Sequence, residues 1–148
     1  MQKIAILYVS YHHRNTKKVV EVLSDRLNAQ LIEFNKDKFF DISKYDVIII
    51  ASGIYFNMMH QSLIDYIKKT DLSNKKIILL YTCGIRYRDY TKKIRQMITD
   101  NKGIYLTTVS CRGYDTYGLL QKIGGIAKNH PSSNDINKIE VKIKKAMI

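Results

Sequence analysis

Polar side chains able to hold an anion follow the first apolar run of the sequence. Residues 4–9 read Ile-Ala-Ile-Leu-Tyr-Val, and residues 10–16 then read Ser-Tyr-His-His-Arg-Asn-Thr. Apolar residues next recur at spacings of three and four, which indicates a helix. A polar turn between a strand and a helix places backbone N–H groups and hydroxyls at the helix N-terminus, where an anion is stabilised. With Ser10, Asn15 and Thr16 as donors, we expect this loop to hold a phosphate.

The pattern of the loop argues against two common phosphate sites. It has no glycine and no Gly-Lys-Ser/Thr ending, unlike nucleoside triphosphatases, and it lacks the G-x-G-x-x-G pattern of dinucleotide-binding domains. A monophosphate suits it better. The loop alone is equally compatible with a capped turn that holds no ligand, with Ser10 or Asn15 as the cap. His12 and His13 are typical of a surface, because no cysteine or carboxylate stands at metal-ligand spacing.

Three further loops that follow predicted strands are rich in glycine, hydroxyl and aromatic residues. They span residues 52–57, 82–87 and 111–118. Tyr55 and Phe56 come directly after an apolar strand and can stack on a flat ligand ring, although packing onto a neighbouring helix would also account for them. In open α/β sheets, ligands bind outside the carboxyl ends of the strands. A phosphate loop beside aromatic loops therefore indicates a planar ring on a phosphorylated tail.

Strands and helices alternate along the rest of the chain. We expect strands over residues 3–9, 30–34, 47–51, 77–81 and 103–110, and helices over residues 15–28, 63–69, 90–98 and 134–146. The strands at 47–51 and 77–81 are continuously apolar, as in a parallel sheet covered on both faces. This alternation predicts a doubly wound α/β fold with helices on both faces of the sheet, in one domain over residues 1–148.

The composition is that of a globular chain, with 45% hydrophobic and 26% charged residues. No apolar run approaches the roughly 20 residues that a membrane span needs. Cys83 and Cys111 are the two cysteines of the sequence. They suggest thiols in a reducing compartment, which we expect to be the cytoplasm, and leave a redox pair open.

The sequence is strongly basic, with a formal net charge of +12 from 25 Lys+Arg and 13 Asp+Glu. Such a charge is compatible with a nucleic-acid binder or with a lysine-rich surface that has no charged partner. The basic residues are spread along the whole chain, which favours the second interpretation. One cluster is able to steer an acidic partner or a phosphorylated ligand, namely Arg86, Arg88, Lys92, Lys93 and Arg95.

Taken together, these motifs resemble the short flavodoxins. The matching segments are S-x-H-x-x-N-T at residues 10–16, A-S-G-I-Y-F at 51–56 with His60 after it, and C-R-G-Y-D-T-Y-G at 111–118, followed by Gly124-Gly125 and His130-Pro131. The resemblance implies a flavodoxin-like fold with five parallel strands in the order 2-1-3-4-5, FMN as the cofactor, and transfer of one or two electrons. It places the phosphate on the first loop, and the isoalloxazine between Tyr55, Phe56 and Tyr87 or its neighbours.

On this resemblance we expect an electron carrier that shuttles electrons between redox protein partners, as a monomer or weak dimer, without nucleic acid and without a membrane span. No catalytic residue and no metal are expected; if the chain is an enzyme, His60, Tyr87 and Arg112 are the first residues to test. The residues expected to contact the cofactor are Ser10, His12, Arg14, Asn15, Thr16, Ser52, Gly53, Ile54, Tyr55, Phe56, Thr82, Cys83, Gly84, Tyr87, Cys111 and Gly113.

Two features depart from typical flavodoxins. The first loop is one residue longer than the S/T-x-T-G-N-T pattern, with His13 and Arg14 where the glycine would fall, and the chain is basic where typical flavodoxins are acidic. Arg14 either contacts the phosphate or points to solvent. Residues 51–69 also resemble the flavodoxin-like protoporphyrinogen dehydrogenases, which use a quinone acceptor, so an FMN-dependent oxidoreductase of that type is the alternative. A nucleic-acid-binding module rests on charge alone.

Overall fold

The computed structural model describes residues 1–85, 88–114, 116 and 118–148. Over this part of the chain, five parallel strands form the centre: β1 (Ile4–Val9), β2 (Gln30–Glu33), β3 (Val47–Tyr55), β5 (Lys76–Cys83) and β6 (Ile104–Arg112). Their order across the sheet is β2-β1-β3-β5-β6, which is 2-1-3-4-5 when the parallel strands are counted along the chain, so the predicted topology is confirmed. A further short strand, β4 (Met58–Met59), pairs antiparallel with the end of β3 and was not predicted.

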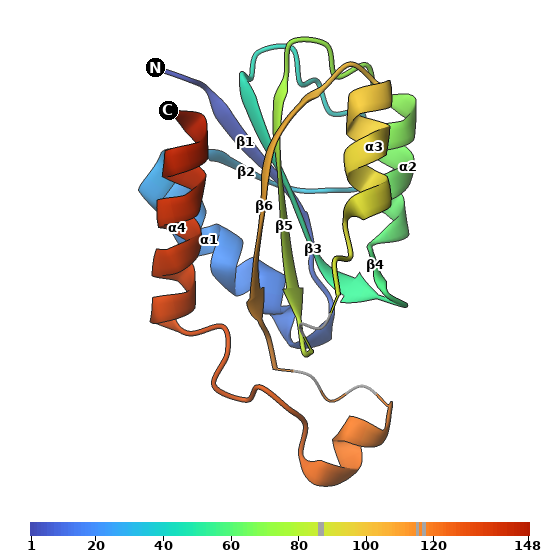
Figure 1. Ribbon diagram of the computed structural model, residues 1–148, viewed down its shortest axis with the longest axis vertical. Coiled ribbons are helices and arrows are strands. Elements are labelled where there is room, and N and C mark those ends of the chain that lie inside the picture. The colour runs from blue at the N-terminus through green and yellow to red at the C-terminus, as the bar shows by residue number, and fades with distance from the viewer. Residues whose placement is uncertain (86–87, 115, 117) are drawn as a thin grey trace.

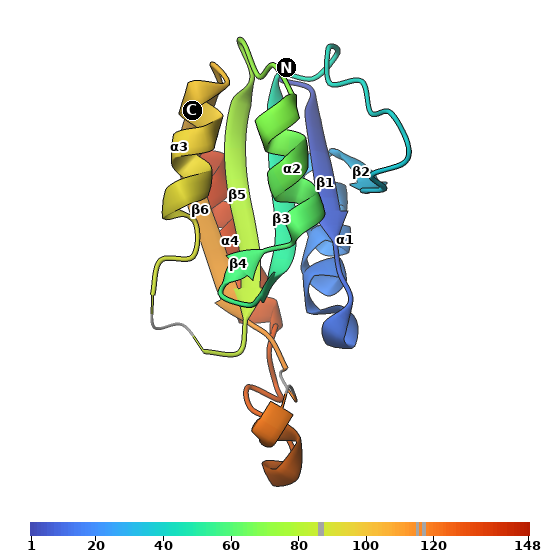
Figure 2. The same ribbon diagram turned by 90° about the vertical axis from the view of Figure 1, so that its right-hand side faces the viewer.

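Helices cover both faces of this sheet. α1 (Asn15–Leu27) and α4 (Ser133–Met147) lie on one face, and α2 (Gln61–Lys69) and α3 (Lys92–Asp100) lie side by side on the other (Figures 1 and 2). Two short 3₁₀ helices complete the described chain: η1 (His12–Arg14) leads into α1, and η2 (Gly118–Ile123) belongs to a loop that projects beyond the carboxyl edge of the sheet (Figure 1).

The third helix starts later than predicted. The sequence predicted residues 90–98, whereas α3 begins at Lys92. The reason is local: the Asp89 carboxylate accepts a hydrogen bond from the Thr91 N–H at 2.9 Å, which closes a turn and keeps Thr91 outside the helix as its N-cap.

The continuous apolar runs of the central strands supply two core layers, one on each face of the sheet. In β3, Ile48 and Ile50 pack in the layer beneath α2 and α3, whereas Ile49 packs in the layer beneath α1 and α4. Each of these side chains is at most 1% exposed, and burying one contributes roughly 1.5–3 kcal/mol. Because both layers need apolar residues, the strand sequence does not alternate, as predicted for a parallel sheet covered on both faces.

A capping box starts α4. The Ser132 hydroxyl accepts from the Asp135 N–H at 3.2 Å, and the Asp135 carboxylate accepts from the Ser132 N–H at 2.7 Å. His130 Nδ1 lies 2.6 Å from the same carboxylate. Partial burial acts to raise the pKa of Asp135, but the hydrogen bonds from Ser132 and His130 outweigh it, so the pKa lies below its usual value of 3.8. The ionised carboxylate therefore stabilises the fold.

Replacing this carboxylate should make stability less dependent on pH. Asp135→Ala should lower the free energy of unfolding by about 1 kcal/mol at pH 7. A carboxyl with a lowered folded pKa stabilises above its unfolded pKa and loses that effect as the pH falls through the folded value, so the difference should shrink between about pH 5 and pH 2. Urea unfolding at several pH values measures it. Asp25→Ala on the exposed side of α1 is the control, and a deficit that stays constant with pH would contradict the assignment.

Candidate functional site

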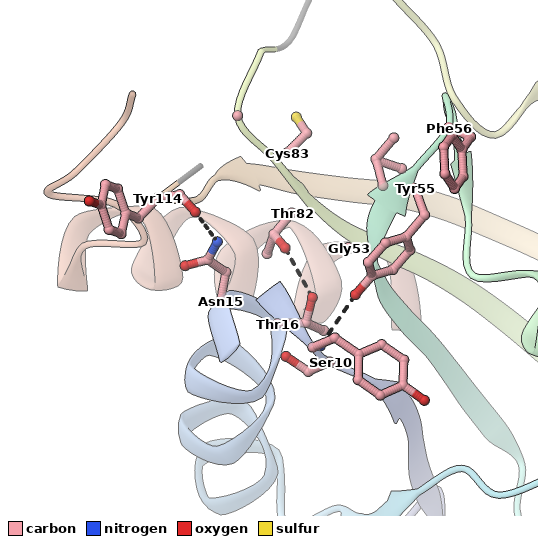
Figure 3. A pocket seen from close by; sticks show the side chains of 12 residues that line it. Ser10, Asn15, Thr16, Gly53, Tyr55, Phe56, Thr82, Cys83 and Tyr114 are labelled. Carbon is pink, nitrogen blue, oxygen red and sulfur yellow. Dashed lines mark hydrogen bonds between the residues drawn. The ribbon is translucent and has the colours of Figure 1, made fainter. Parts of the chain in front are cut away.

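A cavity of about 510 Å³ opens where the carboxyl ends of β1, β3 and β5 meet (Figure 3). Its size falls in the range typical of small-molecule sites. Among the residues that the structure describes, the lining carries no charged side chain. The lining residues are Ser10, Tyr11, Asn15, Thr16, Gly53, Ile54, Tyr55, Phe56, Thr82, Cys83, Gly84 and Tyr114.

The first loop reaches α1 through two consecutive residues in the left-handed region. His13 has φ 53° and Arg14 has φ 52°, at the place where a glycine stands in the flavodoxin pattern. This conformation costs a residue other than glycine roughly 1–2 kcal/mol, so the surrounding contacts must hold the loop in its path. The His13 ring lies 4.2 Å from that of Tyr114, and its Nε2 lies 2.8 Å from the Thr116 hydroxyl. The fourth loop thereby fixes the first.

The start of α1 forms one end of the cavity. Arg14 is its N-cap and makes no side-chain capping bond. Instead the Ser10 hydroxyl accepts from the Lys17 N–H at 3.1 Å. Of the two caps that the sequence left open, Ser10 and Asn15, the structure thus shows Ser10. The amides of the first helical turn have no acceptor within the helix. Because Asn15 and Thr16 line the cavity there, this end favours an anionic ligand group.

Asn15 carries an unsatisfied acceptor at this end. Its side-chain N–H donates to the Tyr114 carbonyl at 2.8 Å, while its Oδ1 is buried and has no partner in the described part of the chain. A Cβ added to Gly113 would lie 2.5 Å from Asn15 Nδ2, so the glycine gives the carboxamide its room. Buried polar atoms are nearly always hydrogen-bonded. A ligand that brings a hydroxyl or N–H donor to Oδ1 would satisfy it.

Two threonine hydroxyls meet below the cavity and join α1 to β5. Thr16 Oγ1 and Thr82 Oγ1 are 2.9 Å apart, and the residues are 1% and 4% exposed. The pair satisfies two polar groups that would otherwise be buried without a partner. It also places a hydroxyl from each element at the cavity wall (Figure 3).

Single and double substitutions should separate the contribution of the hydrogen bond between the two hydroxyls from the effect of burying each side chain. Thr16→Val leaves the Thr82 hydroxyl unpaired and should lower the free energy of unfolding by about 1–3 kcal/mol, and Thr82→Val should act likewise. The double variant removes both hydroxyls, so its deficit should be smaller than the sum of the two by about 1 kcal/mol or more. Urea unfolding of the unsubstituted chain, the two single variants and the double variant measures the four free energies that this double-mutant cycle needs. Strictly additive effects would show that the hydroxyls do not depend on each other.

The opposite wall of the cavity is aromatic. The Tyr55 ring folds back over Gly53, where an added Cβ would lie 3.2 Å from Tyr55 Oη, and the Tyr55 hydroxyl accepts from the Tyr11 N–H at 3.3 Å. Burial raises the pKa of Tyr55 above 10.0, which keeps the phenol neutral. His60 packs behind, with its ring 5.4 Å from those of Tyr11 and Tyr55. Phe56 is 86% exposed at the rim.

His60 serves the fold here. Its ring accepts from the Ser62 N–H at 3.2 Å and thereby caps α2, and burial lowers its pKa. It does not line the cavity. Arg112, the other described candidate for an enzymatic role, donates from Nε to the Gly84 carbonyl at 3.0 Å on the rim. Both side chains thus hold parts of the wall.

The structure brings most of the predicted contacts together, but not all of them. Ser52 lies below the wall, where its hydroxyl donates to the Gly53 carbonyl at 2.7 Å. Arg14 is exposed and outside the lining, with its charge near the buried phenol of Tyr8. Tyr87 lies outside the described residues, and of His12 the structure describes the backbone of η1.

Cys111, another expected cofactor contact, lies outside the lining of the cavity. It is 3% exposed and packs in the core layer beneath α1 and α4, whereas Cys83 packs on the other face and lines the cavity. The reason is a register shift of β6 against β5 between Ile77 and Ile78, which changes the face on which later residues of β6 point. The two thiols lie on opposite faces of the sheet, which rules against a disulfide between them within this fold.

Two lining residues, Tyr11 and Tyr114, were not among the predicted contacts. Each is an aromatic residue two positions after the end of a strand, which is the kind of signal that identified Tyr55 and Phe56. In the part of the chain that the structure describes, no helix has the length and apolarity needed to cross a bilayer. Nor do three or more potential metal ligands come together among those residues.

The fold and the cavity define a class of protein. A doubly wound sheet in the order 2-1-3-4-5, with an uncharged, aromatic-walled cavity beside the start of its first helix, is the arrangement of flavodoxin-like proteins. Residues 5–123 match the family model described as flavodoxin domain, so the chain belongs to the flavodoxin domain family. It is thus a flavodoxin-like flavoprotein.

Relatives and solved structures agree with this class. An uncharacterized protein of Methanocaldococcus jannaschii is 36% identical over 138 residues, which cover 92% of each chain. Among solved structures, the Trp repressor binding protein of Bacillus subtilis matches with a TM-score of 0.70 at 14% identity, over 97% of this chain and 98% of that one. The flavodoxin of Streptococcus pneumoniae TIGR4 matches with a TM-score of 0.65 at 13% identity, over 97% of both chains. At such identities the structures show a shared fold.

Proposed function

We propose that this protein binds FMN without a covalent bond and carries electrons between redox partners. The observation that carries the proposal is the joining, in one uncharged cavity, of an anion-favouring helix start to an aromatic wall. FMN has the matching parts: a phosphate, a chain of hydroxyl groups and a flat ring. When bound, the flavin accepts and donates one or two electrons.

The residues of the cavity fit this cofactor. The first turn of α1 would receive the phosphate, and the buried Asn15 Oδ1, which has no protein partner in the described chain, would accept from a hydroxyl of the ribityl chain. Tyr55 is held by the Tyr11 N–H in a position to flank the ring. The backbone at Gly53 and Gly84 lines the same space and offers hydrogen-bonding groups to a polar ring edge.

The lining favours an electron carrier over an enzyme that moves protons. Its described side chains are hydroxyls, an amide, a thiol and apolar or aromatic groups. Simple electron transfer needs the protein to place the flavin and to tune its surroundings, and the cofactor supplies the redox chemistry. Neither His60 nor Arg112 lines this space, so we assign neither of them a role as general acid or base.

Titration of the purified chain with FMN tests the proposal. We expect one FMN per chain, quenching of the flavin fluorescence as it enters the aromatic cavity, and reversible reduction of the bound flavin. Riboflavin should bind more weakly than FMN because it lacks the phosphate. A chain that binds neither flavin would overturn the proposal. Turnover of protoporphyrinogen with a quinone by the loaded protein would instead support the oxidoreductase alternative.

A further inference from the structure

The register shift in the sheet brings a positive charge to the cavity. Between Ile77 and Ile78 the pairing of β5 with β6 moves by one residue, so that Arg112, and not Cys111, lies beside Cys83 at the carboxyl edge. Successive side chains of a strand point to opposite faces. Because Cys111 packs in the core layer beneath α1 and α4, Arg112 points to the other face of the sheet, the face on which Cys83 packs.

The Arg112 guanidinium is fixed to the wall of the cavity. Its Nε donates to the Gly84 carbonyl at 3.0 Å, and Gly84 lines the cavity next to Cys83. The following residue, Gly113, donates its N–H to the Cys83 carbonyl at 2.9 Å, which holds the backbone on both sides of this contact. Hydrogen bonds from a charged donor are stronger than neutral ones. The positive charge therefore stays beside the backbone that we assign to the polar edge of the flavin ring.

No described group offsets this charge at the cavity. In the part of the chain that the structure describes, no carboxylate forms an ion pair with Arg112, and no charged side chain lines the cavity. The phenol of Tyr55 is neutral at pH 7, because burial raises its pKa above 10.0. The formal net charge of +12 has the same sign as the guanidinium. A negative charge that forms in this cavity is therefore stabilised.

We infer that Arg112 stabilises the reduced form of the bound flavin and thereby raises its reduction potential. The oxidised flavin ring is neutral, whereas the addition of two electrons and one proton leaves one negative charge on it. A fixed positive charge attracts the reduced ring and leaves the neutral ring nearly unaffected. A flavin tuned in this way accepts electrons from weaker reductants, which narrows the class of electron donor. The inference rests on the proposed function.

Three substitutions of Arg112 separate its charge from its hydrogen bond. Arg112→Lys keeps the charge and loses the Nε donor, Arg112→Gln loses the charge and keeps an N–H donor, and Arg112→Glu reverses the charge. The matched control is Lys69→Gln, which removes the same charge from the last turn of α2. Because α2 starts near the carboxyl edge of the sheet, its last turn lies at the other end of the molecule (Figure 2).

Anaerobic titration of the FMN-loaded chain with dithionite, beside a dye of known potential, measures the two-electron potential. We expect Arg112→Gln to weaken the binding of reduced FMN relative to oxidised FMN about 5-fold, which lowers the potential by about 20 mV at about 30 mV per tenfold change. Arg112→Glu should lower it by about 40 mV, from a change of about 25-fold. Arg112→Lys should keep most of the potential, and Lys69→Gln should change the affinity ratio less than 2-fold. Since Arg112 is exposed, these differences should shrink as salt rises from about 20 to 300 mM.

The outcomes separate this inference from the proposed function. Fluorescence titration gives the affinity of each variant for oxidised FMN, so general damage to the cavity is distinguished from a change in potential. Equal potentials in Arg112→Gln and Lys69→Gln would overturn the inference and leave the proposed function intact. An equal loss in Arg112→Lys and Arg112→Gln would also overturn it, because the hydrogen bond and not the charge would then be responsible. A chain that binds no FMN would overturn both.

Discussion

An Asn15→Asp variant should bind FMN about 100-fold more weakly than the unsubstituted chain, while its affinity for riboflavin falls much less. The substitution keeps the shape of the side chain and adds a negative charge to a cavity whose described lining has none. Two charges about 5 Å apart at an effective dielectric constant of about 20 repel by roughly 3 kcal/mol, which corresponds to two powers of ten in affinity.

The comparison of two flavins isolates this repulsion from structural damage. A carboxylate cannot donate to the Tyr114 carbonyl, so the link that Asn15 makes at 2.8 Å is lost for both ligands alike. The ratio of FMN to riboflavin affinity, measured by fluorescence titration, therefore reports the phosphate alone. Asn74→Asp is the control, because Asn74 is exposed in a loop that precedes β5 at the other edge of the sheet. An equal loss for both flavins would place the phosphate elsewhere.

Much of this site was predictable because strand ends can be recognised one at a time. The continuous apolar runs before Ser52 and Thr82 indicate strands of a sheet covered on both faces, and they therefore mark where those strands end. The sequence-distant contacts were not predictable. Asn15 and Tyr114 are 99 positions apart, and no spacing rule joins them. Cys111 shows a second limit, because a single register shift in β6 changes the face of every later residue.

The backbone conformation of the first loop could not be predicted from its residue types. Flavodoxin phosphate loops use a glycine to turn the chain, and this sequence has none there. His13 and Arg14 nevertheless adopt positive φ, the region that glycine favours. Their types gave no sign of it, since residues with a Cβ rarely adopt this conformation. His13 instead contacts Tyr114 and Thr116 in the fourth loop, the latter 103 positions away in the sequence. These contacts hold the backbone in the conformation that a glycine would adopt without them.

Gly113→Ala should damage both the fold and the cofactor site. An added Cβ would lie 2.5 Å from Asn15 Nδ2, 2.6 Å from its Cγ and 2.8 Å from its Cβ, and the last of these is anchored to α1. Overpacking of this kind costs about 1–3 kcal/mol in the free energy of unfolding. Because the displaced group is the amide that we assign to the ribityl chain, FMN affinity should fall about 10-fold or more.

A second glycine and a compensating substitution show which contact is responsible. Gly124→Ala meets nothing within 4 Å but has φ +80°, so it should cost about 1 kcal/mol through strain and leave FMN affinity unchanged. Asn15→Ala combined with Gly113→Ala makes room for the new methyl group. It should recover most of the stability that Gly113→Ala loses, yet none of the affinity, because the carboxamide is gone. Recovery of both would mean that Gly113 acts on the flavin by another route, and recovery of neither would mean that the methyl group disturbs the pairing of the Gly113 N–H with the Cys83 carbonyl at 2.9 Å.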